Sequence, residues 1–162
     1  MLYIRRAEKK DSSLILDFIR LLAKYEKLEH EVTATKEQLE ETIFIKDSSI
    51  EVFFAYEAET PVGFMLIFQN YSTFLAKPGI YLEDLYVKEE YRGRGYGKKM
   101  LQFLAQLAVE RNCGRLEWAV LDWNKPAIDF YQSIGAKLMN SWIINRLTGA
   151  DLRKLANAEM DI

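Results

Sequence analysis

The chain has 162 residues, 49 % of them hydrophobic and 28 % charged, with a formal net charge of -2 at pH 7. A chain of this length and composition can bury a sizeable core, and we expect one domain spanning residues 1–162. The nearly balanced charge gives no general attraction for nucleic acid or an anionic membrane surface, so a small-molecule partner is expected. Apolar stretches such as 62–68 fall far short of the ~20 residues that a membrane span needs.

Cys113 is the only cysteine and His30 the only histidine. Intrachain disulfides are therefore impossible, and a reducing cytoplasm is the expected location of a soluble protein. No spacing of His, Cys, Asp and Glu matches a metal-ligand pattern, so we expect no metal. The N-terminus does not resemble an export signal, because Arg5 and Arg6 lie inside a strand-like segment.

Periodicity and turn residues predict five elements in the first part of the chain. A short strand precedes an amphipathic helix, which begins after Asp11 and Ser12. Thr35 and Gln38 have the spacing of a capping box and predict the start of a second, short helix. Two strands then form a hairpin around a turn at 59–61. The expected elements are a strand at 2–6, a helix at 14–25, a short helix with Leu39, Ile43 and Phe44 facing inward, and strands at 51–56 and 62–68.

The second part of the chain predicts alternating strands and helices. A strand leads into a glycine cluster at 93–97, where a long helix begins, and Pro126 opens a later, short helix. Hairpins combined with strand-helix-strand units predict the α/β or α+β class around one mixed sheet. The expected elements are strands at 79–87, 116–121 and 136–146, helices at 126–133 and 151–158, and a long helix with the apolar stripe Met100, Leu101, Leu104, Ala105, Leu107 and Ala108.

The segment Arg92-Gly93-Arg94-Gly95-Tyr96-Gly97-Lys98 lies where a strand ends and a helix begins. Unpaired backbone N–H groups and the positive end of the helix dipole meet there, which favours phosphate binding. The glycines let the backbone approach phosphate oxygens, and the three cations can pair with a pyrophosphate. The segment lacks the Gly-Lys-Ser/Thr ending of a nucleotide-triphosphate loop, and Lys98 stands where a dinucleotide fingerprint has its last glycine. The alternative is a tight connection with solvated cations.

This loop resembles that of the GNAT superfamily of N-acetyltransferases, which has the form Arg/Gln-x-x-Gly-x-Gly/Ala, here Arg92, Gly95 and Gly97. Four further segments, in the same order, resemble the spermidine/spermine and thialysine N-acetyltransferase branch: 23–28, 81–87, 122–124 and 129–131. The resemblance implies a single-domain GNAT-like fold with a central mixed, mostly antiparallel sheet flanked by helices. It also implies acetyl-CoA as the co-substrate and a homodimer.

The resemblance further implies where the cofactor is held. Backbone near the end of the 79–87 strand would hold the pantetheine arm and the acetyl carbonyl, and the glycine loop would hold the pyrophosphate. Asn124 would contact the cofactor from the next strand end, and Tyr131 would stand near its sulfur. The implied cofactor-binding residues are Leu85, Tyr86, Val87, Arg92, Gly93, Arg94, Gly95, Tyr96, Gly97, Lys98, Asn124, Ala127 and Tyr131.

Acetyl transfer from a thioester to an amine requires a neutral amine, a stabilised oxyanion and a proton for the departing thiolate. An alkylamine has a pKa of about 10, so a base must remove its proton, and Glu83 is the candidate, acting through water as in the related enzymes. Tyr131 is the candidate general acid, and backbone N–H near Val87 would polarise the carbonyl. From the residues alone, Tyr131 can also be a core aromatic, and Glu83 and Asp84 can face opposite sides of a strand.

The expected substrate is a compact cationic amine. The loop Tyr71-Ser72-Thr73-Phe74 lacks the Asp and Trp that polyamine enzymes have before this strand, and it resembles the thialysine enzymes. A thialysine- or lysine-like amine or a short diamine is therefore favoured over spermine, although acetylation of a protein lysine or N-terminus and a non-catalytic acyl-CoA sensor stay open. The expected substrate contacts are Tyr25, Glu26, Phe74, Glu83 and Asp84, with Glu29 and Glu31 forming either an acidic rim or a solvated helix end.

Overall fold

A computed structural model describes residues 1–159. The chain divides into two compact units, Met1–Leu121 and Asp122–Ile162. The first unit contains a central sheet with helices, and the second contains two helices joined by irregular chain. The expectation of one domain over residues 1–162 stays a prediction. No helix within residues 1–159 is both long and apolar enough to cross a membrane.

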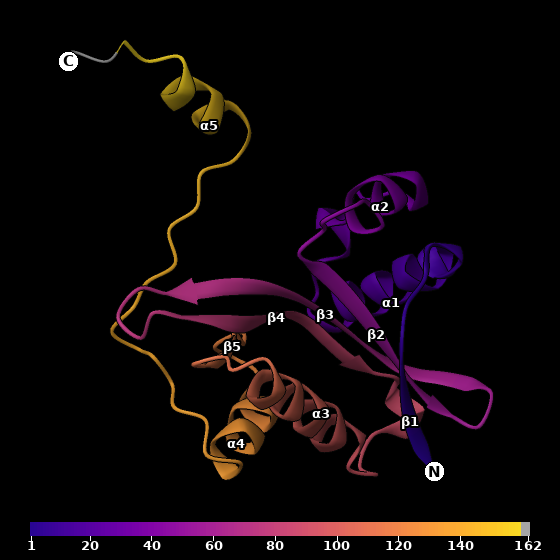
Figure 1. Cartoon of the computed structure of the whole chain (residues 1–162). Helices are drawn as coiled ribbons and strands as arrows, with labels where there is room; N and C mark the ends of the chain where they lie inside the picture. Colours follow the sequence, from indigo (N-terminus) through magenta and orange to yellow (C-terminus); the bar gives the residue numbers. More distant parts are fainter. Residues whose placement is uncertain (160–162) are drawn as a thin grey trace. The chain divides into compact units, whose positions relative to one another are not determined.

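One mixed sheet forms the centre of the first unit, with its strands in the order β1-β2-β3-β4-β5 (Figure 1). Neighbours from β1 to β4 are antiparallel, whereas β4 and β5 run parallel. The predicted fold class, a mixed and mostly antiparallel sheet flanked by helices, is confirmed. The strands are Leu2–Arg6 (β1), Ile50–Glu57 (β2), Thr60–Ser72 (β3), Lys77–Val87 (β4) and Leu116–Trp118 (β5).

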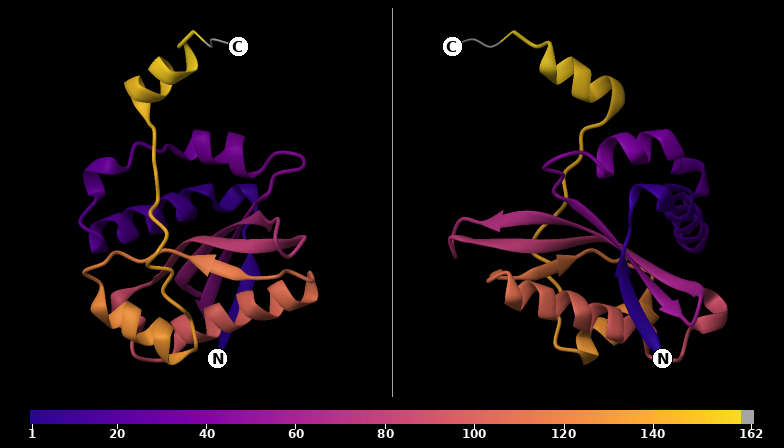
Figure 2. Two further views of the ribbon diagram at one scale, coloured as in Figure 1. Left: turned by 90° about the vertical axis from the view of Figure 1, so that its left-hand side faces the viewer. Right: turned by 45° about the vertical axis from the view of Figure 1, so that its right-hand side comes forward.

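Helices cover both faces of this sheet, with α1 and α2 on one face and α3 on the other (Figures 1 and 2). Because both faces are covered, β2 and β3 contain uninterrupted buried runs rather than alternating ones. The helices of the first unit are Ser12–Tyr25 (α1), Lys36–Ile43 (α2) and Tyr96–Glu110 (α3), with short 3₁₀ turns at Lys9–Asp11, Glu29–Glu31 and Glu89–Tyr91.

Phe18 of α1 is the centre of the core on the α1 face. Its ring centroid lies 5.9 Å from that of Phe54, 5.2 Å from that of Phe64 and 6.4 Å from that of Tyr86. These three rings come from β2, β3 and β4, so one helical side chain joins three strands. On the opposite face Met100 and Leu104 of α3 are fully buried. Burial of large aromatic rings in such pairs is a major source of stability.

Local sequence signals account for the helix boundaries. Thr35 accepts a hydrogen bond from the Gln38 backbone N–H (3.2 Å), and the Gln38 side chain accepts one from the Thr35 N–H (3.0 Å), which confirms the predicted capping box. The stripe on α3 is narrower than expected, because Ala105 is exposed. The turn between β2 and β3 lies at 58–59, so Pro61 already belongs to β3.

The second unit contains α4 (Lys125–Ser133) and α5 (Gly149–Ala156), close to the predicted helices. The predicted strand at 136–146 is wrong, because these residues are irregular. A strand needs a neighbouring strand to pair its backbone groups, and no strand of the described chain pairs with this segment. The strand predicted at 116–121 is also shorter than expected: β5 ends at Trp118, where its pairing with β4 stops opposite Leu82.

Candidate active site

The glycine loop follows β4 and ends at the first turn of α3. Gly93 and Gly95 have φ angles of 77° and 75°, a left-handed conformation that L-residues other than glycine rarely adopt. Gly95 is the N-cap of α3, and the Lys99 N–H makes the first helical bond, to the Gly95 carbonyl (3.1 Å). No acidic residue lies in this first turn. The N-terminal N–H groups of α3 therefore have no helical acceptor, as an anion-binding site requires.

Space at the loop is also suitable for a ligand. A Cβ atom added to Gly93, Gly95 or Gly97 would meet no atom of the described chain within 4 Å. Packing within the chain therefore does not explain these glycines. Backbone conformation explains Gly93 and Gly95, and at Gly97 the missing side chain leaves the helix start open to a bound group.

Both arginines of the loop are held by other parts of the first unit. Arg94 Nη1 lies 3.2 Å from Oε2 of Glu57, at the end of β2, and its guanidinium carbon lies 5.0 Å from the Tyr91 ring centroid. The Tyr96 hydroxyl donates a hydrogen bond to the same Glu57 oxygen at 2.6 Å. Arg92 donates from Nε to the Val87 carbonyl at 3.0 Å. Contacts within the first unit thus hold both arginine side chains of the loop.

The end of β4 has an edge that no strand of the described chain covers. β5 pairs only with Ile80, Tyr81 and Leu82, so the edge from 83 to 87 continues beyond β5. Alternate backbone N–H and C=O groups of a strand point toward each edge. An extended, amide-containing ligand can therefore bind along this edge as a further strand would. The predicted cofactor residues Leu85, Tyr86 and Val87 lie on it.

A β-bulge interrupts β4 at the same place. Leu66 of β3 pairs with Asp84 and the next residue, Ile67, pairs with Leu82, which leaves Glu83 as the extra residue. A bulge bends its strand and changes the direction of the side chains, so the usual alternation of faces does not hold across Glu83 and Asp84.

Three carboxylates meet near this bulge. Glu26 at the end of α1, Glu83 and Asp84 lie close enough to repel one another, because Glu83 raises the pKa of both other groups. Burial is the main cause for Asp84, whose pKa is raised to about 7, followed by the charges of Glu83 and Glu26. Burial also raises the pKa of Glu26, followed by the charge of Glu83. No salt bridge joins any of the three to a Lys or Arg within residues 1–159, so a bound cation would relieve the repulsion.

The end of α1 places Tyr25 and Glu26 at this cluster. Leu28 N–H bonds to the Ala23 carbonyl (2.8 Å) and Lys27 N–H to the Lys24 carbonyl (3.1 Å), which is a Schellman motif. Lys27 takes the left-handed position, with φ of 62°, where glycine is usual. A strained residue next to a charged cluster is typical of functional sites. Glu26 is also the C-cap, where the helix dipole disfavours a negative charge.

The remaining predicted cofactor residues belong to the second unit. Asn124 is the N-cap of α4 and is buried, with 9 % exposure, and its carbonyl accepts a hydrogen bond from Ile128 N–H at 3.0 Å. Ala127 and Tyr131 follow three and seven residues later, so all three lie on one face of the helix. Tyr131 is partly buried and its ring centroid lies 5.6 Å from that of Phe130.

The structure does not bring Phe74 of the same chain to the carboxylates. Phe74 is 100 % exposed in the turn between β3 and β4. Lys77 and Glu83 are six residues apart on β4, which corresponds to roughly 20 Å along a strand. Ser72, at the end of β3, is buried and accepts a hydrogen bond from Leu75 N–H at 3.3 Å, so it stabilises the turn. The role of Phe74 as a substrate contact stays a prediction.

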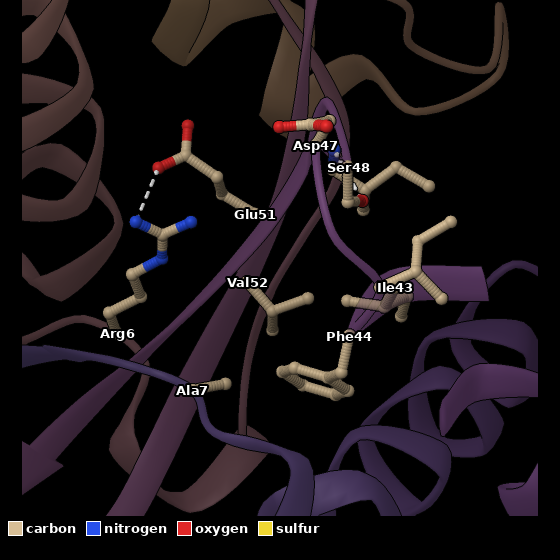
Figure 3. A pocket seen from close by; sticks show the side chains of 10 residues that line it. Arg6, Ala7, Ile43, Phe44, Asp47, Ser48, Glu51 and Val52 are labelled. Atoms are coloured by element: carbon tan, nitrogen blue, oxygen red, sulfur yellow. Dashed lines mark hydrogen bonds and ion pairs between the residues drawn. The ribbon is translucent and has the colours of Figure 1, made fainter. Parts of the chain in front are cut away.

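Two open pockets lie elsewhere in the first unit. One, of about 250 Å³, lies between the end of α2 and β2, beside the ion pair of Arg6 and Glu51 at 3.3 Å (Figure 3). The other, of about 600 Å³, lies along α1 and is lined by Arg20, Leu21 and Val32 among others. Neither includes the glycine loop or the three carboxylates. Within residues 1–159, no group of three His, Cys, Asp or Glu side chains is arranged to hold a metal.

Known proteins connect this geometry to a family. The model of the acetyltransferase (GNAT) family matches residues 15–136. The chain belongs to this family. Thialysine N-epsilon-acetyltransferase of Bos taurus is 41 % identical over 164 residues, which cover 94 % of this chain and 96 % of that protein. The chain is therefore an N-acetyltransferase, and the predicted resemblance to this branch is confirmed.

Two further proteins are similar to this acetyltransferase. L-ornithine N5-acetyltransferase of Arabidopsis thaliana is 47 % identical over 93 residues, which are 57 % of this chain and 41 % of that protein. An integron cassette protein from the mobile metagenome of V. cholerae has a TM-score of 0.81 and 30 % identity, covering 97 % of this chain and 98 % of that chain. The fold of the acetyltransferase therefore agrees with that of a solved structure over nearly its whole length.

Sequence reasoning missed two parts of the site. It did not identify Glu57, because a glutamate before a hairpin turn has no local sign of a partner 37 residues away at Arg94. It also missed the bulge at Glu83, because strand periodicity does not show where the register changes. The adjacent carboxylates Glu83 and Asp84 were the available signal, since regular alternation would bury one of two neighbouring charges.

We predict that Asp84→Asn stabilises the protein above pH 7 much more than at pH 4. The folded-state pKa of Asp84 is about 7, against about 3.9 in an unfolded chain, so folding becomes less favourable as pH rises between these values. Asparagine removes this loss, which is of the order of 2–4 kcal/mol. Urea unfolding at pH 4, 6 and 8 measures it. Asp17→Asn, which removes an exposed carboxylate of α1, is the control; an equal effect of Asp84→Asn at all three pH values contradicts the burial of a charged group here.

Proposed function

We propose that this protein is an acetyl-CoA-dependent N-acetyltransferase that acetylates the primary amine of a small molecule by direct transfer. The observation that supports it is the meeting, at the end of β4, of an uncovered strand edge, an open glycine loop and three carboxylates without a cationic partner in the described chain. The edge and the loop suit an extended cofactor with a pyrophosphate, and the carboxylates suit a cationic amine. A thialysine- or lysine-like amine or a short diamine is the proposed substrate.

In this proposal the first unit holds most of the cofactor. Backbone at Leu85, Tyr86 and Val87 binds its amide-containing arm, and the N–H groups from Gly93 to Lys98 bind the pyrophosphate. The fit rests on the positive φ angles, the open space and the unpaired helix start at this loop. Asn124, Ala127 and Tyr131 share a face of α4, and the family resemblance is the ground for proposing that they contact the cofactor. Acetyl-CoA supplies an acetyl group activated as a thioester.

Two side chains move protons in the proposed reaction. Glu83, through a water molecule, takes the proton that the ammonium must lose before its nitrogen can attack the acetyl carbon. A C–N bond forms and the C–S bond breaks; the attacking nitrogen loses its second proton to solvent, and the Tyr131 hydroxyl donates a proton to the departing sulfur and is reprotonated from water. Backbone N–H near Val87 stabilises the negative charge on the carbonyl oxygen. Tyr25, Glu26 and Asp84 bind and orient the amine.

A compact amine is favoured by charge and by the relatives. Glu26, Glu83 and Asp84 form one group of carboxylates, which suits one ammonium and its near neighbour rather than a series of distant ones. The relatives described above are named for thialysine and L-ornithine. Acetylation of a protein lysine or N-terminus would leave the small amines unmodified.

The proposal includes a homodimer in the cytoplasm. Trp142, Ile143 and Ile144, in the segment predicted as a strand, are 77 %, 83 % and 74 % exposed. Three consecutive large apolar residues are unusual on the surface of a monomer and are typical of association sites. Pairing with a second copy would give this segment the partner strand that it lacks within the described chain. A cytoplasmic location rests on the single cysteine.

We predict that the protein releases coenzyme A from acetyl-CoA with thialysine, lysine, ornithine or a short diamine at higher kcat/KM than with spermine. Thiol release across a panel of amines, with the acetylated product identified by mass spectrometry, measures the ranking. Gly95→Asp is the control, because it adds a side chain at φ of 75° and a negative charge beside the pyrophosphate, and it should abolish cofactor binding in calorimetry. Preference for spermine over every shorter amine would refute the proposed substrate class, and no turnover of any amine would favour an acyl-CoA sensor.

We predict that Tyr131→Phe lowers kcat by ~100-fold or more, because general acid catalysis typically contributes that much. The variant should keep its fold and its affinity for acetyl-CoA, since the ring is retained. Circular dichroism and calorimetry check these two properties, and single-turnover kinetics measures the chemical step. A variant within twofold of the wild-type rate would show that the thiolate takes its proton from another group.

We predict that the wild-type protein is a dimer and that Trp142→Asp weakens it. A charge placed among exposed apolar side chains at an interface opposes their burial. Light scattering coupled to size exclusion over a range of concentrations measures the mass. Val109→Asp, at an 80 % exposed position of α3, is the matched control and should stay dimeric. A monomeric wild type, or a Trp142→Asp variant as dimeric as the control, contradicts this part of the proposal.

A further inference from the structure

Arg92 makes three contacts that lead away from the phosphate-binding backbone. Its guanidinium carbon lies 4.7 Å from the Tyr25 ring centroid and 5.2 Å from the Tyr86 ring centroid. Its Nε donates a hydrogen bond to the Val87 carbonyl at 3.0 Å. The two rings lie 6.5 Å apart, edge to face. Arg92 therefore joins the end of α1 to the end of β4.

The two rings differ in how firmly the rest of the fold holds them. Tyr86 is buried, with 8 % exposure, and its ring packs on Phe18 in the core. Tyr25 is exposed at the last turn of α1, where the chain leaves the helix through the strained residue Lys27. Arg92 thus connects a fixed ring to one at a helix end, where backbone fraying is usual. Cation–π contacts of this kind favour one orientation of the exposed ring.

Tyr25 is followed directly by Glu26, one of the three carboxylates. Because the two residues share the last turn of α1, a change in the position of Tyr25 moves the Glu26 carboxylate relative to Glu83. The neighbouring loop arginine has no such connection, since Arg94 contacts Glu57 and Tyr91. The side chains of Arg92 and Arg94, which are two residues apart, therefore contact different parts of the first unit.

We infer that Arg92 is a positioning residue for the amine-binding site, holding Tyr25 and Glu26 in place against β4, rather than chiefly a ligand of the cofactor phosphate. The inference rests on the proposed function for the identity of the two substrates. The inference also states that Arg92 orders the end of α1, and this can be measured without enzyme turnover.

The kinetic test compares Arg92→Gln with Arg94→Gln, which removes the same charge from the same loop. Arg92→Gln should raise KM for the best amine of the panel by about fivefold or more, because two cation–π contacts are lost, and change the Kd of acetyl-CoA by less than about threefold. Arg94→Gln should change KM for the amine by less than about twofold. A larger effect of Arg92→Gln on acetyl-CoA affinity than on amine KM would overturn the inference.

A double-mutant cycle and hydrogen exchange separate positioning from a general loss of charge. In a Tyr25→Leu background, Arg92→Gln should change amine KM by less than twofold, because its partner ring is already absent. Hydrogen exchange of the amides at 25–31 should be faster in Arg92→Gln than in wild type and unchanged in Arg94→Gln. Unchanged exchange in Arg92→Gln, or independent effects in the cycle, refutes the inference. If the wild type acetylated none of the amines, the proposed function would be refuted. The hydrogen-exchange result would then still decide whether Arg92 orders the end of α1.

Discussion

The extra residue at Glu83 in β4 is the constraint on which the candidate site depends. It changes the register against β3 within the part of the strand that β5 does not reach. The bend that a bulge produces can account for the short contact between β4 and β5, and thus for the uncovered edge at 83–87. The bulge also brings the carboxylates of Glu83 and Asp84 into one electrostatic cluster. One irregularity is therefore common to the uncovered edge and the acidic cluster.

The cationic loop is ordered by the protein itself. Arg94 and Tyr96 share the Glu57 carboxylate, and Arg92 lies on two aromatic rings and a carbonyl oxygen. A loop whose long side chains already have partners loses less conformational entropy when it binds a ligand. The negative Glu57 opposes a second anion nearby, so in the proposed function the backbone N–H groups of α3 would supply much of the attraction for phosphate. This division leaves Arg92 available for the end of α1.

The sequence alone predicted features that depend on residues close together in the chain. It failed where contacts between distant segments determine the structure. The capping box at Thr35 and the glycine loop are local, and their elements are as predicted. The strand at 136–146 failed because its apolar pattern is typical of a strand, but pairing depends on a partner outside the segment. The contacts of Arg92 with Tyr25 join residues 67 positions apart, and no spacing rule contains them. Family resemblance proposed the roles of Tyr131 and Glu83, which neither periodicity nor composition could give.

The charge of the site explains why amine and cofactor would meet at one strand end. Glu26 lies at the C-terminal end of α1, where the helix dipole disfavours an anion. Burial, and then the charges of Glu83 and Glu26, raise the pKa of Asp84 to about 7. A bound ammonium would reduce both penalties, so in the proposed function the carboxylates lower stability when no cation is bound and favour cation binding. Once the amine has given up its proton for transfer, the acetylated nitrogen is a neutral amide and would lose this attraction. Repulsion among the carboxylates would then return. The site would release the acetylated product more readily than the cationic substrate, and it would attract another cation.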